Sequence, residues 1–280
     1  MDGILRLAWL SVLIAGCADT STFRLRLAGA QIPVELTESW LHESKSPRFD
    51  VTRVAPVYLS QQGFEALRDG RADLACTDRP IAAGELKDFG AARPAGRRIG
   101  FYGFALYVHP SNRVESIFAG HLSLLFQHKI SDWRELGGRD GAIRLIGPKK
   151  STRGGTVLMQ QARIWFAQPT WEALDSDHAI VDAVAADPLA LGFAAIGLDN
   201  PARYLGLRME RSAAPAFPSL EEIESERYGL AKVIYLYTAA EPDAGAQAAL
   251  DFLFSEAGGA ALQSTGVWPI PRERSAVATP

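Results

Sequence analysis

The chain has 280 residues, of which 48% are hydrophobic, and its 29 Lys and Arg residues nearly balance its 32 Asp and Glu residues. This composition supplies a sizeable core for one large domain or two lobes, and the balanced charge offers neither a basic footprint for nucleic acid nor an acidic disordered tail. The five histidines show no paired spacing typical of zinc ligands, so we expect no metal site.

Residues 1–16 have the pattern of a lipoprotein signal peptide. Arg6 precedes an apolar stretch from Leu7 to Ala15, which is too short to be a comfortable transmembrane helix. The stretch ends in Ile-Ala-Gly followed by Cys17, a sequence that resembles a lipobox, in which cleavage leaves an acylated cysteine at the new N-terminus. We therefore expect lipidation of Cys17 and attachment to a membrane. An ordinary signal peptide or a small uncleaved anchor is the alternative.

The cysteines and their neighbours bear on location and redox state. Ala18 follows Cys17, and alanine at that place in a Gram-negative lipoprotein permits export to the outer membrane, whereas aspartate would favour retention in the inner membrane. We expect a periplasm-facing, membrane-anchored lipoprotein, with the outer membrane favoured over the inner. Acylation of Cys17 would leave Cys76 as the remaining thiol, so we expect no intrachain disulfide and interpret Cys76 as a buried apolar residue.

After the signal peptide, strand-like and helix-like segments alternate, as expected for an α/β sheet with crossover helices. No apolar run approaches the roughly 20 residues that span a bilayer. The expected strands are Phe23–Ala28, Phe49–Val54, Ala72–Cys76, Ile99–Val108, Ile143–Ile146, Ala190–Ile196 and Ala231–Tyr237. The expected helices are a segment through Trp40 and His42, Gly63–Arg68, His121–Gln127, a segment after Gly155, Ala179–Ala186 and Ala244–Phe254.

Two of these strands are long apolar runs that suggest crossings between two lobes. Ile99–Val108 is interrupted by Gly100 and Gly103, and Ala231–Tyr237 lies near the end of the chain. We therefore predict an α/β fold with two hinge crossings. Lobe I spans residues 22–103 and is completed by residues 233–280, and lobe II spans residues 104–232.

Six short segments, taken in order along the chain, are similar to one known family. They are Ala-Gly-Ala-Gln-Ile-Pro at 28–33 with Trp40, Ser-Gln-Gln-Gly-Phe at 60–64, Ala-Asp-Leu-Ala-Cys-Thr-Asp-Arg-Pro-Ile at 72–81, Lys-Ile-Ser-Asp-Trp at 129–133 with Gly137 and Gly138, Leu-Gly-Phe at 191–193, and Phe-Leu-Phe-Ser-Glu-Ala-Gly at 252–258 before Gly266. In this order and spacing they resemble the substrate-binding proteins of phosphate ABC transporters (PstS-like proteins). The resemblance implies a periplasmic-binding-protein-like (type II) fold.

A further segment, Lys-Ser-Thr-Arg-Gly-Gly-Thr at 150–156, stands where this family has its third anion-binding loop. A glycine-containing loop that opens a helix directs several backbone N–H groups at one point, where the helix dipole also favours negative charge. Thr156 adds a hydroxyl donor, and Lys150 or Arg153 supplies a countercharge. The alternative is a helix N-cap with solvated basic neighbours.

Asp78 stands at the position of the family's buried aspartate, which accepts a hydrogen bond from a protonated oxygen of phosphate. A carboxylate repels an anion unless that anion carries a proton that it can donate. Asp78 therefore favours phosphate over sulfate. The rival interpretation is an ion pair of Asp78 with Arg79 or Lys150.

The resemblance implies an oxyanion site with several departures from the family pattern. The implied ligand-binding residues are Gln31, Ile32, Ser60, Asp78, Lys150, Arg153, Gly154, Gly155 and Thr156. Gln31 and Ile32 replace Thr or Ser and Phe, Gln62 occupies a position that is typically Gly, and Ser60 keeps the family's serine donor. In the third loop, Lys150 replaces an Arg that grips anions with two nitrogens, Thr152 replaces the Asp that orients that Arg, and Gly154 replaces a Ser donor.

The leading functional hypothesis is a lipid-anchored, monomeric solute-binding protein that captures phosphate for an ABC-type uptake or sensing system and contacts its permease. The alternative is a repurposed protein with a weak phosphate site that serves an envelope assembly, secretion or signalling complex. An enzyme is not expected, because neither paired carboxylates nor a nucleophile elbow are evident. We expect no cofactor. Trp40, Trp133, Trp165 and Trp268 are interpreted as packing residues, and Glu221, Glu222, Glu224 and Glu226 as a solvated face.

Overall fold

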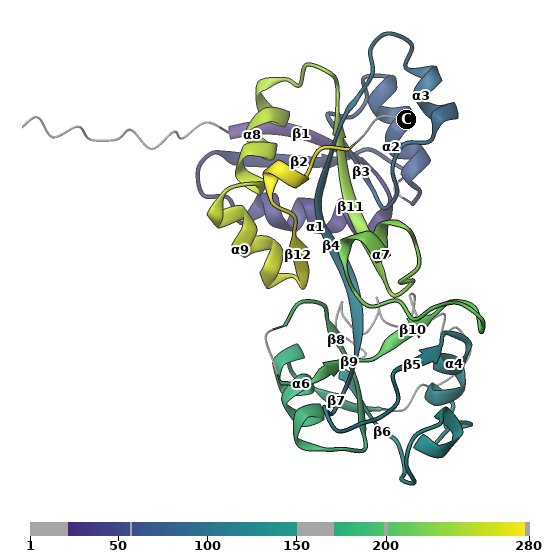
Figure 1. Cartoon of the computed structure of the whole chain (residues 1–280). Helices are drawn as coiled ribbons and strands as arrows, with labels where there is room; N and C mark the ends of the chain where they lie inside the picture. The colour runs from purple at the N-terminus through teal and green to yellow at the C-terminus, as the bar shows by residue number, and fades with distance from the viewer. Residues whose placement is uncertain (1–21, 57, 150–170, 199–200, 278–280) are drawn as a thin grey trace, which may run out of the picture.

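The computed structural model describes residues 22–56, 58–149, 171–198 and 201–277. They form two lobes stacked end to end, and the long strand β4 (Ala95–Val108) runs from one lobe into the other (Figure 1). This mixed α/β, two-lobed arrangement is the one predicted from the sequence. Within the described residues, no helix is both long and apolar enough to cross a bilayer.

The sheet of lobe I combines parallel and antiparallel pairing. Strands β2, β1 and β3 pair in parallel, β11 lies antiparallel to both β3 and β4, and β12 pairs antiparallel with β4. The elements of this lobe are β1 (Thr22–Gly29), α1 (Gln31–His42), β2 (Arg48–Arg53), α2 (Ser60–Arg68), β3 (Leu74–Thr77), α3 (Ala83–Asp88), β11 (Ala231–Thr238), α8 (Ala244–Leu253), α9 (Glu256–Ser264), β12 (Val267–Pro269) and the 3-10 turn η2 (Arg272–Arg274).

The sheet of lobe II continues from the second half of β4. Strands β8 and β9 pair antiparallel with β4, while β6 pairs in parallel with β8 and β7. The elements are β5 (Ser116–Phe118), α4 (Gly120–Phe126), the 3-10 turn η1 (Trp133–Leu136), β6 (Arg144–Pro148), β7 (Glu172–Leu174), α6 (Asp177–Ala186), β8 (Ala190–Ala195), β9 (Arg203–Tyr204) and β10 (Gly206–Arg208). Helix α7 (Leu220–Glu224) packs beside β11.

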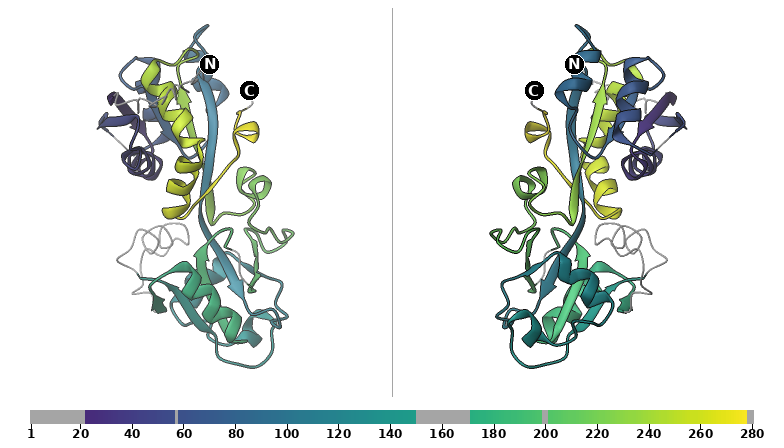
Figure 2. Two further views of the ribbon diagram at one scale, coloured as in Figure 1. Left: turned by 90° about the vertical axis from the view of Figure 1, so that its left-hand side faces the viewer. Right: turned by 90° about the vertical axis from the view of Figure 1, so that its right-hand side faces the viewer.

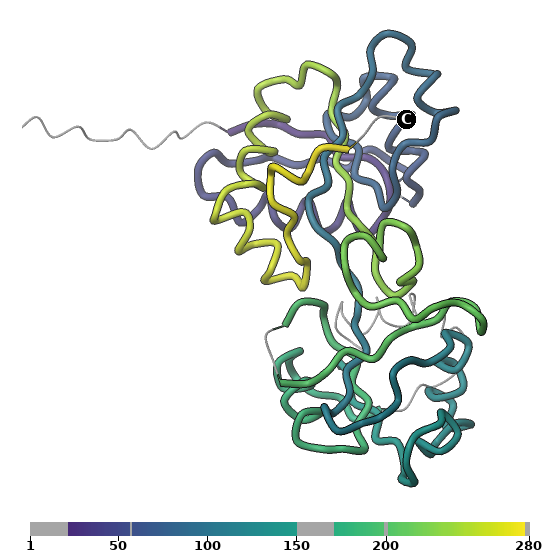
Figure 3. Tube along the Cα trace, in the orientation of Figure 1, coloured from purple at the N-terminus to yellow at the C-terminus, as the bar shows by residue number. Residues whose placement is uncertain are grey.

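Strand β4 changes partners at Gly103. Residues up to Gly103 pair with β11, and residues from Phe104 onward pair with β8. Gly103 has a φ of +145°, and a Cβ atom there would lie 2.3 Å from the carbonyl oxygen of Leu230, so only glycine fits. The chain leaves lobe I here and returns beside the same point, where β11 begins (Figure 3).

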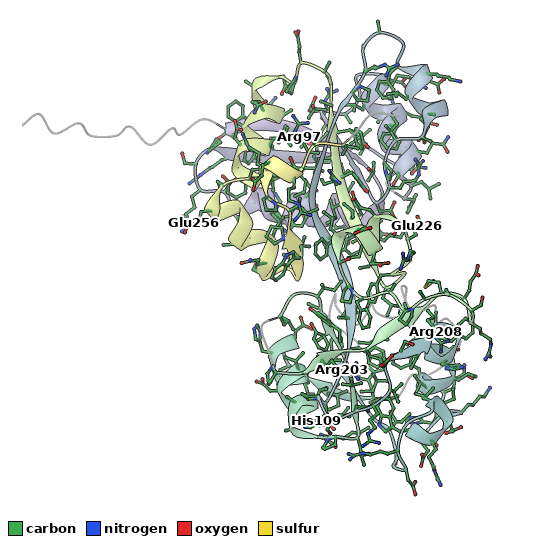
Figure 4. The ribbon with its side chains drawn as sticks, in the orientation of Figure 1. Arg97, His109, Arg203, Arg208, Glu226 and Glu256 are labelled. Atoms are coloured by element: carbon green, nitrogen blue, oxygen red, sulfur yellow. The ribbon has the colours of Figure 1, made fainter. Side chains whose placement is uncertain are left out.

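The core is continuous across this junction. Every residue of β4 from Ile99 to Val108 is buried, so the strand contributes side chains to both lobes. Helices α1 and α7 lie on opposite sides of β4 (Figure 2). In lobe II, Arg203 (labelled in Figure 4) donates hydrogen bonds to the carbonyl oxygens of Asn112 and Val114, which fixes the loop before β5.

Every strand expected from the sequence is present, and so is each expected helix that lies within the described residues. The helix expected after Gly155 lies outside them. The elements that the sequence did not indicate are short or follow directly on another helix, such as β5 and β10, which pair across about 90 positions. A strand of three residues carries too little periodicity to be recognised.

One interpretation of individual side chains is confirmed for the described residues, and one needs correction. Trp40 and Trp133 are buried, and Trp268, although 41% exposed, packs its ring against Gly197 of lobe II, so these three are packing residues as expected. The glutamates after Ser219 are not simply a solvated face. Glu224 accepts two hydrogen bonds from Arg98, at 2.8 and 2.9 Å, because α7 lies against the sheet. Trp165 lies outside the described residues.

Candidate functional site

Three turns of lobe I meet at one edge of its sheet. Strands β1, β2 and β3 are parallel, so their carboxyl ends share an edge, and each is followed by a turn that carries a candidate residue. Helix α1 begins at Gln31 directly after β1, α2 begins at Ser60 after β2, and Asp78 follows β3. Ligands of α/β proteins commonly bind at the carboxyl ends of parallel strands.

Two glycines bring these turns into contact. Gly29 has a φ of +132°, and a Cβ atom on it would lie 2.0 Å from the carbonyl oxygen of Cys76. That close approach lets the N–H of Ala30 donate to the same oxygen at 2.9 Å. Gly63 of α2 faces Gly29, with its own Cβ position 2.8 Å from the Cα of Gly29. The starts of α1 and α2 are therefore held side by side.

Ser60 and Asp78 form the centre of the cluster. The Ser60 hydroxyl donates to Oδ1 of Asp78 at 2.6 Å, and the backbone N–H of Asp78 donates to Oγ of Ser60 at 3.1 Å. The sequence placed both residues at the site, and the structure brings them together. Their reciprocal bonds join the first turn of α2 to the end of β3.

Lys232 completes this cluster. Its Nζ lies 3.0 Å from Oδ2 of Asp78 and donates a hydrogen bond to it, and the lysine side chain is 46% exposed. Strand β11 is antiparallel to β3, with Tyr235 opposite Thr77, so the start of β11 extends past the end of β3 to the position of Asp78. Lys232 was not among the site residues predicted from the sequence. The signal was a single charged side chain inside the apolar run Ala231–Tyr237.

These contacts determine the charge of Asp78. Burial alone would raise the pKa of its carboxyl group, but the hydrogen bond from Ser60 and the charge and hydrogen bond of Lys232 outweigh burial, and the net pKa is lowered. Burial, followed by the nearby Asp78 charge, raises the pKa of Tyr102 on β4. Asp78 is therefore a stable carboxylate with a cation beside it.

The rival ion pair of Asp78 with Arg79 is absent. Arg79 instead donates to both oxygens of Glu85, at 2.8 and 2.6 Å. Glu85 is within reach because it lies six positions further along the chain, in the first turn of α3. Lys150, the other proposed partner, lies outside the described residues. Among the described residues, the ion pair of Asp78 is with Lys232.

Two glutamines at the starts of the helices bond locally. Oε1 of Gln62 accepts hydrogen bonds from the N–H groups of Tyr58 and Leu59, both at 3.1 Å, as in a capping box. Nε2 of Gln31 donates to Oε1 of Glu35 one turn further along α1, at 3.1 Å. Each glutamine replaces a residue that the family resemblance associates with the anion loops.

A cavity of about 440 Å³ lies between the lobes. Its lobe I side includes Ile32 and Leu36 of α1 and residues 264–266, and its lobe II side includes Lys149 and Asp177. Tyr102 also lines it and lies near enough to Asp78 for that charge to act on its hydroxyl. Ser60, Asp78 and Lys232 are not among the described residues that line this cavity.

The described part of the candidate site comprises Gln31, Ile32, Ser60 and Asp78, together with the newly found Lys232. Lys150, Arg153, Gly154, Gly155 and Thr156 lie outside the described residues, and so does Cys17. Within the described ranges, His, Cys, Asp and Glu side chains do not form a group that could hold a metal ion. Cys76 is fully buried, and burial raises the pKa of its thiol to about 12.

Comparison with known proteins identifies the family. A family model described as the PBP superfamily domain matches residues 20–257. The chain therefore belongs to the PBP superfamily, which confirms the resemblance recognised from the sequence segments.

Individual proteins similar to this chain include several named as phosphate-binding proteins. The phosphate-binding protein PstS of Bacillus subtilis (strain 168) is 23% identical over 197 residues, a match covering 70% of this chain and 64% of that protein, so less than two thirds of the relative is spanned. The structure of a possible phosphate binding protein from Planctomyces limnophilus is similar with a TM-score of 0.65 at 18% identity, covering 91% of this chain and 95% of that one. PstS from Borrelia burgdorferi gives a TM-score of 0.56 at 16% identity, covering 88% and 98%. These structures share the fold.

Proposed function

We propose that this protein is a lipid-anchored solute-binding protein that captures an inorganic oxyanion, phosphate, between its two lobes for an ABC-type phosphate uptake or sensing system. The proposed lobe I comprises residues 22–103 and 233–280, and lobe II residues 104–232. The last of these boundaries falls inside β11, whose first two residues, Ala231 and Lys232, pair with the lobe I part of β4. The observation that carries the proposal is the Ser60–Asp78–Lys232 cluster at the meeting point of three turns. The relatives named for phosphate binding support the choice of ligand.

In this proposal the first two loops and Asp78 bind the anion from lobe I. Lys232 supplies donors, and the Ser60 hydroxyl, which gives its one proton to Asp78, holds that carboxylate in place. The amide groups in the first turn of α1 point toward the anion with the favourable end of the helix dipole. The loop at 150–156 contacts the anion from lobe II. An anion held by both lobes stabilises the closed arrangement, because it gains contacts that the open one lacks. Binding and release then suffice, and no chemical step is required.

The proposal also places the protein in the envelope. Acylation of Cys17 anchors it to a membrane facing the periplasm, and Ala18 favours the outer membrane. A permease partner in the inner membrane would need the protein to reach it there.

Isothermal titration of the purified mature protein in detergent micelles with phosphate, arsenate and sulfate tests the proposal. We expect saturable 1:1 binding of phosphate, weakened about tenfold by Ser60→Ala, because Asp78 loses the hydrogen bond from Ser60 that holds its carboxylate in place. Ser123→Ala in lobe II, whose hydroxyl accepts from Gln127, serves as the matched control and should bind as the unaltered protein does. A folded protein that gives no heat with any of the three anions would contradict the proposal.

A second candidate function is a repurposed binding protein that serves an envelope assembly, secretion or signalling complex. The observation that favours it is that Gln62 and Gln31 bond to their own helices at positions that the family resemblance assigns to anion loops. Membrane fractionation together with titration separates the two candidates. Outer-membrane location with silent titrations supports the second function, and phosphate binding at either membrane supports the first, because Ala18 favours the outer membrane in both.

A further inference from the structure

Lys232 raises the question of which anions the site accepts. A lone carboxylate in a binding cleft excludes any anion that cannot donate a proton to it. Asp78 is not alone: Oδ1 accepts from Ser60 at 2.6 Å and Oδ2 accepts from Lys232 at 3.0 Å. The carboxylate is already hydrogen-bonded and carries a cation at contact distance.

We infer that Lys232 broadens the anion class of this site, so that it takes tetrahedral oxyanions whether or not they carry a proton, sulfate as well as phosphate. The inference rests on the proposed function, since it concerns the same site. The charges of Asp78 and Lys232 nearly cancel, so the pair exerts little net repulsion on an incoming anion. The anion can then bind without donating a proton to the carboxylate. Lysine has three N–H donors, and Asp78 takes one of them.

The surroundings of Asp78 support this role for Lys232. Arg79, the adjacent cation, is bound to Glu85, and Tyr102 opposite Lys232 in the sheet is buried and neutral. Among the described residues, Lys232 is thus the cation that compensates Asp78. Its side chain is 46% exposed, against 26% for Asp78, so the ammonium group is the more accessible of the two.

The position of Lys232 is determined by the sheet rather than by a flexible loop. It lies in β11 opposite Tyr102 of β4, in a strand whose other residues are all buried. The charged end of the lysine is therefore held beside the end of β3 by backbone pairing. A substitution at this position changes the charge next to Asp78 without altering a turn or a helix cap.

The test measures phosphate and sulfate affinities by isothermal titration at pH 7 for the mature protein and three variants. The unaltered protein should bind the two anions within about tenfold of each other. Lys232→Met should weaken sulfate relative to phosphate by about 10- to 100-fold, the range of one charge-assisted hydrogen bond, because Asp78 then repels an anion that has no proton. The double variant Lys232→Met with Asp78→Asn should regain sulfate binding, since the repelling carboxylate is gone.

Lys45→Met is the matched control, because Lys45 is exposed after the far end of α1 and the same charge is lost there. It should leave the ratio of the two affinities unchanged. If Lys232→Met does not fold, the unaltered protein and the double variant still decide the question, because the double variant buries no unpaired carboxylate.

The outcomes separate the inference from the proposed function. Binding of phosphate with rejection of sulfate by the unaltered protein overturns the inference and leaves the proposed function standing. Equal sulfate binding by Lys232→Met and the unaltered protein also overturns the inference. Binding of neither anion by the unaltered protein overturns the proposed function itself.

Discussion

At the scale of single residues, Asp78 couples the site to the stability of lobe I. Its carboxylate joins α2 through Ser60 and β11 through Lys232, so one ionised group connects a helix start with a strand of the sheet. Ser60 and Asp78 were predicted from the sequence because each stands in a short segment similar to the family. Lys232 was not, because it is 154 positions from Asp78 and only the sheet brings the two together.

This arrangement predicts that the folded protein loses stability at acid pH, when Asp78 is protonated. The folded pKa of Asp78 is below its ordinary value of about 3.9, so the stabilisation is fully present above about pH 4 and is lost as the pH falls through the folded pKa. Asp78→Asn should lower the free energy of unfolding by about 1–2 kcal/mol at pH 7 and by less at pH 3. Urea unfolding at both pH values measures this.

The exposed Asp50 provides the control for that experiment, since its side chain is 65% exposed. Asp50→Asn should change the free energy of unfolding by no more than about 0.5 kcal/mol at either pH. An Asp78→Asn effect that is equally large at pH 3 and pH 7 would show that ionisation of Asp78 does not contribute.

At the scale of elements, the contact of α2 with β1 determines where the candidate donors lie. A Cβ atom on Gly63 would be 2.8 Å from the Cα of Gly29 and 3.1 Å from the carbonyl oxygen of Ala28. Both are backbone atoms, which cannot rotate away as a side chain does. The helix would have to move outward from β1 to accept even one methyl group.

Gly63→Ala is therefore expected to lower the free energy of unfolding by about 1–3 kcal/mol, the usual cost of overpacking, and to weaken phosphate binding by displacing Ser60. Gly84→Ala in α3 is the matched control, because nothing lies within 4 Å of its Cβ position, and it should be neutral within about 0.5 kcal/mol or slightly stabilising. Thermal unfolding and titration of both variants provide the measurement. Equal stability of the two variants would show that α2 can move outward from β1 at little cost in free energy.

The elements also show which parts of the fold can be predicted from sequence patterns. Strands such as β1 and β8 and helices such as α1 and α6 were predicted because their apolar residues recur over six or more positions. The pair β5–β10 was not, because Ser116 and Gly206 are partners only in the folded chain. The same holds for Glu224, which was interpreted as solvated although Arg98 binds it from 126 positions away.

At the scale of the whole molecule, the two lobes share one strand and one core. The buried stretch Ile99–Val108 has no exposed position at the junction, and the largest cluster of buried side chains includes Leu25 in one lobe and Phe193 in the other. Unfolding of either lobe would expose part of β4. We therefore expect the lobes to unfold together.

Urea unfolding tests this expectation with one reporter from each lobe. Trp40 and Trp133 are both buried. Two variants, each retaining one of them and carrying phenylalanine at every other tryptophan of the mature chain, therefore report each lobe separately by fluorescence, against the far-ultraviolet circular dichroism of the whole chain. The midpoints should coincide. Two resolved transitions, one for each reporter, would show that the junction does not couple the lobes.

The sequence by itself determined the α/β alternation, the long strands and helices and the membership of a family, and it was enough to predict Ser60 and Asp78 as site residues. All of these depend on local periodicity or on short segments, which can be recognised directly in the linear sequence. The tertiary structure alone decided that Lys232 pairs with Asp78, that Arg79 pairs with Glu85, and that a cavity lies between the lobes. These features depend on which strands lie side by side, and this is determined by the packing of residues far apart in the chain.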